Sequence, residues 1–267
     1  MKKIIYVIMI NYNGIEDTEK CIESIYSSNN NLFTIKTIIV DNASSVSNKE
    51  RLRSLTADNN DIEVIYNTSN FGFAKANNIG LSYIHSKYGF EDNSFLYFLN
   101  NDTLLNRSLL QALEANLPSE NEVLYFEMRS FDNKYVNNGL NYLNPYFGRY
   151  RETYKKKYIE YICGASIFLK NTDKVPFWND EYFLYFEDVD YSLRLRNSGY
   201  VFRKLNNVFY NHKVGASSKN SKVNSYKIQS QKKFMKENGK CYLLFCFCKF
   251  FYLLLKFKIS LLREFVK

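Results

Sequence analysis

The chain has 267 residues, of which 46% are hydrophobic and 17% aromatic, and its net charge is +9 at neutral pH. This length and apolar content suffice for one large domain, or for one domain with an appendage, and they argue against global disorder. The charge is uneven, because residues 213–267 contain 13 Lys and Arg against 2 Glu while residues 1–212 carry −2. A basic tail on a slightly acidic body argues against a nucleic-acid-binding core and indicates a tail that meets an anionic surface.

Strands and helices are expected to alternate along the first hundred residues. Apolar runs predict strands at 4–10, 34–40, 62–66 and 95–99. Helical spacing predicts helices from about residue 17, at 48–55 and up to about residue 86. This order predicts an α/β fold with a parallel sheet and right-handed crossovers. The two lysines before residue 4 faintly resemble the start of a signal peptide, but the apolar run is short and no cleavage site follows.

The second half of the body is less regular. A helix near residue 107, a strand at 165–169, a helix that ends at Gly199 and a strand at 208–210 are expected. The stretch 133–154 is rich in Asn, Tyr and Gly without clear periodicity, and an irregular connection is favoured over a mobile acceptor-side loop. The five cysteines are odd in number and form no C-x-x-C pair. They therefore indicate a reducing cytoplasm instead of a zinc site or a disulfide framework.

Three of the predicted strands end in polar residues, at Asn11, at Asp41 and at Asn100 to Asp102. Turn chemistry explains any one of these clusters, but three at one edge of a sheet indicate a binding site. A hard divalent cation would use carboxylate and amide oxygens there together with substrate phosphates. Gly72 and Ala74 leave room for a backbone to approach a ligand, and no Walker loop or G-x-G-x-x-G motif occurs.

A second acidic cluster, Glu187, Asp188 and Asp190, opens a predicted helix behind a run of aromatic residues. Capping and helix-dipole interactions are one explanation. The other is a general base, because neighbouring like charges and aromatic walls raise the pKa of a carboxyl group. Of the two histidines, His85 lies in a predicted helix and is expected to be structural, and His212 follows a strand.

Eight segments carry a resemblance to a known family: I-N-Y-N-G at 10–14, I-V-D-N-A-S at 39–44, N-F-G-F-A-K-A-N-N-I-G at 70–80, F-L-N-N-D at 98–102, C-G-A-S at 163–166, E-Y-F-L-Y-F-E-D-V-D-Y at 181–191, L-R-N-S-G-Y at 195–200 and H-K-V-G-A-S at 212–217. In this order they resemble family 2 of the inverting, nucleotide-sugar-dependent glycosyltransferases. The likeness is closest to the rhamnosyltransferase-like branch that builds bacterial surface polysaccharides. No single motif decides this, but the ordered set over residues 4–218 does.

The resemblance implies the A-type glycosyltransferase fold, an α/β fold with a Rossmann-like, mostly parallel sheet flanked by helices. The catalytic domain would span residues 1–218, with a nucleotide-binding half at 1–105 and an acceptor-binding half at 106–218. The residues that would bind the donor are Asn11, Asn13, Asp41, Asn42, Asn70, Gly72, Asn77, Asn78, Asn101 and Asp102. Asp102 would also hold a divalent cation, Mn or Mg, with His212 as a further ligand. Asn100 stands where the family has an aspartate, which removes one charge.

Asp188 matches the family's catalytic base, with Glu187 and Asp190 beside it. The resemblance then implies transfer of a sugar, from dTDP-rhamnose or a UDP-hexose, to a growing cell-surface glycan or a lipid-linked acceptor. One alternative is a sugar-phosphate nucleotidyltransferase, but the basic Gly-rich loop that it needs after the first strand is absent. The other is an inactive glycan-binding or scaffold homologue at the membrane. The presence of Asp102, Asp188 and His212 at the matching positions argues against this alternative.

The tail, residues 219–267, is expected to be helical, with a first helix at about 222–237. The apolar segment 241–255 is shorter than the roughly 20 residues that cross a bilayer. An interfacial helix with flanking lysines fits better, so the protein is predicted to be cytoplasmic and peripheral at the inner face of the cell membrane. The alternative is a helix that packs on the enzyme's own core or on the partner in a homodimer.

Overall fold

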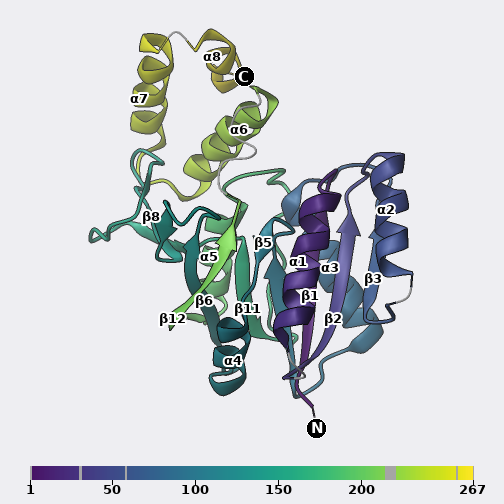
Figure 1. Cartoon of the computed structure of the whole chain (residues 1–267). Helices are drawn as coiled ribbons and strands as arrows, with labels where there is room; N and C mark the ends of the chain where they lie inside the picture. The colour runs from purple at the N-terminus through teal and green to yellow at the C-terminus, as the bar shows by residue number, and fades with distance from the viewer. Residues whose placement is uncertain (1, 30–31, 58, 214–220, 257, 267) are drawn as a thin grey trace.

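The computed structural model describes residues 2–29, 32–57, 59–213, 221–256 and 258–266. Its body is a central sheet with helices on both faces, and three C-terminal helices lie together at one end of it (Figure 1). The motif at 212–217 is described only as far as Lys213, and the predicted boundary at residues 218 and 219 lies outside the described residues.

The first half of the body is a parallel α/β unit, as the sequence predicts. Its strands are β1 (Ile4–Asn11), β2 (Thr34–Asp41), β3 (Ile62–Tyr66) and β4 (Ser94–Leu99). They pair in parallel in the order β3-β2-β1-β4. The helices α1 (Ile15–Asn29), α2 (Val46–Thr56) and α3 (Phe73–Tyr88) connect them in turn.

Both faces of β1 and β4 are buried, which explains the unbroken apolar runs of these two strands. Alternate side chains of β1 enter different cores. Ile5 and Val7 join the core beneath α1 and α2, and Tyr6 and Ile8 join the core beneath α3. A strand covered on one face only would have alternated polar and apolar residues.

The second half of the sheet is mixed, which agrees with the expected mostly parallel sheet. β11 (Ser166–Lys170) runs antiparallel between β4 and β6 (Glu122–Arg129). β12 (Val201–His212) is parallel to β6 and antiparallel to the short β5 (Thr103–Leu104). The helices here are α4 (Arg107–Ala115) and α5 (Glu187–Asn197). An apolar run marks a buried strand but does not encode its direction, so the directions of these strands were not predicted from the sequence.

The stretch 133–154, expected to be an irregular connection, contains short strands. β7 (Val136–Asn137) pairs with β6. β8 (Leu140–Leu143) pairs with β9 (Tyr150–Arg151) and with β10 (Ile159–Ile162) in a separate antiparallel sheet. Strands of two to four residues are too short for a period-2 pattern to show in the sequence.

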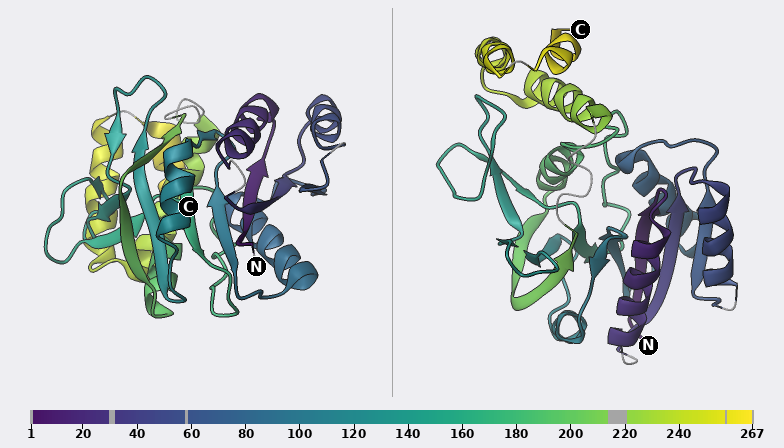
Figure 2. Two further views of the ribbon diagram at one scale, coloured as in Figure 1. Left: turned by 60° about the horizontal axis from the view of Figure 1, so that its bottom comes forward. Right: turned by 45° about the horizontal axis from the view of Figure 1, so that its top comes forward.

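The tail folds into α6 (Ser221–Asn238), α7 (Tyr242–Leu255) and α8 (Ile259–Val266). α6 lies between the body and the other two helices (Figure 2). One apolar cluster joins all three helices to the body: Tyr182, Phe186 and Val189 with Ile228, Phe234, Met235, Phe245, Leu253 and Phe265. Leu243, Phe247 and Leu255 of α7 are 80%, 63% and 74% exposed. One face of α7 therefore packs on the enzyme and the other is open, and no helix in the described part of the chain is long and apolar enough to cross a membrane.

Candidate active site

A cavity of about 590 Å³ opens at the carboxyl ends of β1, β2 and β4. Half of the ten residues predicted to bind the donor line it: Asn42, Asn70, Gly72, Asn101 and Asp102. The sequence did not predict its other walls, which include Tyr12, Phe183 and Tyr226. The rings of Phe183 and Tyr226 stack with centroids 4.3 Å apart, so α6 closes one side of this donor-side cavity.

Asn11 and Asp41 do not line this cavity and are completely buried. The Asn11 Nδ2 donates to Asp41 Oδ1 at 2.9 Å, and the backbone N–H of Ser44 donates to Asp41 Oδ2 at 3.1 Å. Asn13 Oδ1 accepts the backbone N–H of Ser45 at 2.8 Å. These bonds hold the loops after β1 and β2 together. Asn11, Asn13 and Asp41 therefore support the edge of the sheet at which the donor-side cavity opens.

Asn77 and Asn78 fasten α3 to its surroundings. The Asn77 Nδ2 donates to the carbonyl oxygen of Phe73 at 3.0 Å within the helix. The Asn78 side chain donates to Trp178 O and accepts from Trp178 N, each at 2.8 Å. This reciprocal pair joins α3 to the segment that leads into α5.

Gly72, directly before α3, makes a second junction with the same segment. Its φ of +82° and ψ of 179° suit glycine, and a Cβ there would lie 2.4 Å from the carbonyl oxygen of Phe183. That carbonyl also accepts the N–H of Phe73 at 2.9 Å. The sequence suggested that the backbone at Gly72 approaches a ligand closely, and Gly72 does line the cavity, but its closest neighbour is the protein's own chain at Phe183.

Asp102, His212 and Asn100 form a polar cluster at the cavity. His212 Nε2 lies 3.0 Å from Asp102 Oδ1 and 3.4 Å from Asn100 Nδ2. Asn100 Oδ1 is buried without a hydrogen-bond partner among the described residues. A carboxylate oxygen, an imidazole nitrogen and an unpaired amide oxygen suit Mn²⁺ or Mg²⁺. No group of three or more His, Cys, Asp or Glu side chains that could hold a metal ion occurs in the described ranges, so these residues would fill only part of an ion's coordination shell.

The three acids of α5 have different environments. Asp190 is buried and forms an ion pair with Arg194, with Oδ2 2.6 Å from Nε. Glu187 is buried with Oε2 unpaired, and burial together with the Asp188 charge raises its pKa well above the ordinary range. Asp188 is half-buried, and burial raises its pKa to about 6 although the N–H of Val189 donates to it at 2.9 Å.

Asp188 lines a second cavity, of about 610 Å³, whose walls include Asn137, Tyr150, Tyr161 and Cys163. Its backbone position is unusual, because α5 follows two consecutive residues with left-handed φ, Tyr185 at 68° and Phe186 at 67°. Such strain persists where the surrounding structure imposes it and is common at functional sites. The strained turn delivers the carboxylate to the wall of this acceptor-side cavity.

The strand-entry segment 163–165 links the two cavities. The N–H of Asn100 donates to Ala165 O at 2.9 Å. Gly164 lies against Asp188, since a Cβ at Gly164 would be 3.1 Å from the Asp188 Cβ. Burial and then the charges of Asp188 and Asp102 raise the pKa of the Cys163 thiol to about 11. The charges of the two acids therefore both act on one short segment.

Residues 6–175 match the model of the family described as Glycosyl transferase family 2. The chain belongs to this family. It is similar in structure to a mannosyltransferase from Pyrobaculum calidifontis in complex with GDP-Man and Mn²⁺, with a TM-score of 0.61, 14% identity, and coverage of 92% of this chain and 67% of that one. It is also similar to S. aureus TarS 1–349 in complex with UDP-GlcNAc, with a TM-score of 0.59, 14% identity, and coverage of 100% and 72%.

A third similar structure is GalNAc-T7 with UDP, GalNAc and Mn²⁺, with a TM-score of 0.61 and 12% identity, where 79% of this chain covers 43% of that one. No curated protein matches the chain in sequence. At these identities the likeness shows the fold, and the expected A-type glycosyltransferase fold is confirmed. The family match confirms a glycosyltransferase and gives the nucleotidyltransferase alternative no support.

The junction at Gly72 can be tested against a matched glycine at the other end of the same helix. Gly89 also has positive φ, 68° with ψ of −147°, but a Cβ there would meet nothing within 4 Å. Gly89→Ala should lower the free energy of unfolding by about 1–3 kcal/mol through backbone strain alone. Gly72→Ala should cost about 1–3 kcal/mol more, because its Cβ also collides with the Phe183 backbone. Urea unfolding measures both, and equal losses would contradict the close contact.

Proposed function

We propose that this glycosyltransferase moves a sugar from a nucleoside diphosphate sugar to a hydroxyl group of a glycan or lipid-linked acceptor, with inversion at the anomeric carbon. One observation carries the proposal: the charges of Asp102 in the donor-side cavity and of Asp188 in the acceptor-side cavity both act on the same segment, 163–165. A donor phosphate at the first acid and an acceptor hydroxyl at the second would place the reacting atoms between them.

The donor side supports a nucleoside diphosphate and a divalent cation. Structures with the same fold were obtained with GDP-Man, UDP-GlcNAc and Mn²⁺. In this chain Asp102, His212 and the unpaired Asn100 Oδ1 are the groups that would hold an ion. Such an ion neutralises charge that grows on the departing diphosphate. Tyr12 and the Phe183–Tyr226 stack offer aromatic surface for the base or the sugar.

The acceptor side supports Asp188 as the general base. Its carboxylate accepts the proton as the acceptor oxygen bonds to the anomeric carbon and the bond to the diphosphate breaks. Of its two acidic neighbours, Glu187 is more deeply buried and Asp190 is held by Arg194. A single base and one in-line displacement invert the configuration without a covalent intermediate. The donor itself, dTDP-rhamnose or a UDP-hexose, stays a prediction of the sequence resemblance, which thermal-shift screening of nucleotide sugars would test.

The first test is Asp102→Ala. With Mn²⁺ present, calorimetry should show nucleoside diphosphate affinity reduced at least tenfold, or about 1.4 kcal/mol, because the only carboxylate of the proposed ion site is lost. Asp92→Ala, an exposed aspartate at the opposite end of β4, is the matched control and should bind as the wild type does. Equal affinity of the wild type with and without the metal would contradict the ion assignment.

The second test is Asp188→Asn, which keeps the shape and removes the base. Transfer should slow at least 100-fold while donor binding is retained. In the wild type, kcat/KM should be flat above pH of about 6 and should fall tenfold per pH unit below it, because Asp188 acts only when deprotonated. Near wild-type turnover of the variant would move the role to Glu187 or Asp190. A wild type that binds donor but transfers nothing to any acceptor would favour the inactive homologue.

The open face of α7 supports a peripheral membrane location at the cytoplasmic side. Phe247 and Leu255 are exposed, and Lys256, Lys258 and Arg263 follow closely. Apolar side chains would enter the headgroup boundary while the cations meet anionic lipid, each cation at about 1 kcal/mol.

The double variant Phe247→Ser with Leu255→Ser should bind anionic vesicles at least tenfold more weakly, since each buried side chain contributes about 1.5–3 kcal/mol. Flotation measures this, and high salt should weaken wild-type binding as well. Val46→Ser, a 71% exposed apolar residue on α2, is the control and should float like the wild type. Equal flotation of wild type and double variant would contradict the membrane role. Loss of wild-type self-association in the double variant would instead assign the face to a homodimer.

A further inference from the structure

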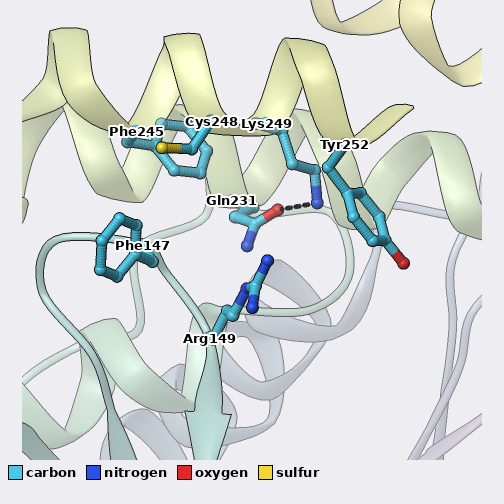
Figure 3. A pocket seen from close by; sticks show the side chains of 7 residues that line it. All are labelled: Phe147, Arg149, Gln231, Phe245, Cys248, Lys249 and Tyr252. Carbon is cyan, nitrogen blue, oxygen red and sulfur yellow. Dashed lines mark hydrogen bonds between the residues drawn. The ribbon is translucent and has the colours of Figure 1, made fainter. Parts of the chain in front are cut away.

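A group of cations lies at the seam between the body and the tail, apart from the site described above. Two adjoining cavities of about 300 and 370 Å³ share Arg149, Gln231, Lys249 and Tyr252. Figure 3 shows Lys249 and Tyr252 reaching down from α7 toward Arg149 on the opposite wall. Arg151, Lys227 and Lys258 also line the larger cavity. We call this site, with its five basic residues, the basic pocket.

The cations of the basic pocket are not neutralised by the protein. No carboxylate lines either cavity, and none of the five forms an ion pair with a residue in the described part of the chain. The Lys249 Nζ donates to Gln231 Oε1 at 2.7 Å (Figure 3), while Gln231 is buried and donates to Gly148 O. Burial and the charges of Lys227, Arg149 and Lys258 lower the pKa of Lys249 to about 8. Like charges held together in a hollow favour an anionic ligand, and guanidinium and ammonium groups suit phosphate oxygens.

The basic pocket adjoins the acceptor-side cavity. Tyr150 and Arg151 line both. Lys227 lies over the rings of Tyr150 and Tyr185, at 5.5 and 5.1 Å from their centroids, and its charge acts on Asp188. An anion in the basic pocket would therefore lie next to a group that occupies the cavity beside Asp188.

The same tail carries an apolar surface. Phe250 of α7 and Leu262 and Val266 of α8 line an open groove of about 530 Å³ with Arg263 at its side. Leu243, Phe247 and Leu255 extend the exposed apolar surface of α7. A ligand with a sugar, a phosphate and a hydrocarbon chain in that order matches three neighbouring features of the protein. These are the cavity beside Asp188, the basic pocket, and the apolar face of α7 and α8.

We propose that the basic pocket binds the phosphate or diphosphate of a lipid-linked glycan acceptor, whose first sugar lies in the Asp188 cavity and whose lipid chain follows α7 and α8. The class of acceptor rests on the proposed function, whereas the anion site rests on the five cations alone. The donor's own diphosphate is assigned elsewhere, to the cavity of Asp102. The two anion sites are distinct because no residue lines both.

The test uses the full chain and farnesyl diphosphate as a soluble probe, with binding followed by calorimetry at saturating Mn²⁺ and nucleoside diphosphate. Lys249→Met and Lys227→Gln should each weaken probe binding at least tenfold. Lys236→Met, on α6 and exposed, is the matched control and should change it less than twofold. Because Lys249 also bonds Gln231, thermal unfolding confirms that its variant folds, and Lys227, which is exposed, provides an independent second variant.

Inorganic pyrophosphate distinguishes a lipid-linked diphosphate from a free one, because it carries the same anion without a lipid chain. It should bind at least tenfold more weakly than farnesyl diphosphate, and equal binding would overturn the lipid-linked acceptor. Displacement of the probe by nucleoside diphosphate, or unchanged binding in both pocket variants, would overturn the basic pocket as the site. Nucleoside diphosphate binding is measured in a separate titration of the same protein preparation. If the protein binds the probe but not the nucleoside diphosphate, the proposed function is contradicted and the anion pocket is still supported.

Discussion

The junction between α3 and the segment before α5 is the contact on which the arrangement of the site depends. It consists of the reciprocal Asn78–Trp178 hydrogen bonds and of Gly72 against the backbone of Phe183. Trp178 also stacks on Tyr191 of α5, with ring centroids 3.8 Å apart. A helix of the parallel first half thereby fixes the helix that carries the acids, across about a hundred residues of sequence. Without this junction the donor-side cavity would lose the Phe183 wall and Asp188 would lose its position relative to Asp102.

The buried acids work against the stability of the fold. Burial raises the pKa of both Glu187 and Asp188, so the folded state favours their protonated forms. A carboxyl group with a raised pKa contributes stability at low pH and loses it as pH rises from the unfolded pKa, near 4, to the folded one. For Asp188 this window ends at about pH 6. At neutral pH the Asp188 carboxylate is therefore charged at a cost in stability, which is the state that the proposed general base requires.

The sequence predicted the strands β1 to β4 almost to the residue, and the signal is clearest for β1 and β4, which are buried on both faces and read as apolar runs. It predicted neither β7 to β9, which are too short for periodicity, nor the direction of β11. Of the site, polar residues at strand ends identified Asp102 and Asn42 correctly as cavity-lining, since geometry alone brings the ends of parallel strands together. The same rule placed Asn11 and Asp41 with them, but their side chains turn inward to each other. Tyr226 and Lys227 had no signal, because their role comes from where α6 docks.

That docking makes α6 the element through which the parts of the molecule are connected. Along one helix, Tyr226 lines the donor-side cavity, Lys227 lines the basic pocket, Ser230 donates to Leu184 O, and Phe234 packs beneath α7 and α8. Tyr226, Ser230 and Phe234 recur at intervals of four, so they share one side of the helix, and Lys227 lies next to them. An α-helix of 18 residues is about 27 Å long and stiff over that length. Any surface that holds α7 and α8 therefore also fixes Tyr226 against Phe183, and the position of the tail and the shape of the donor-side cavity are set by the same rigid body.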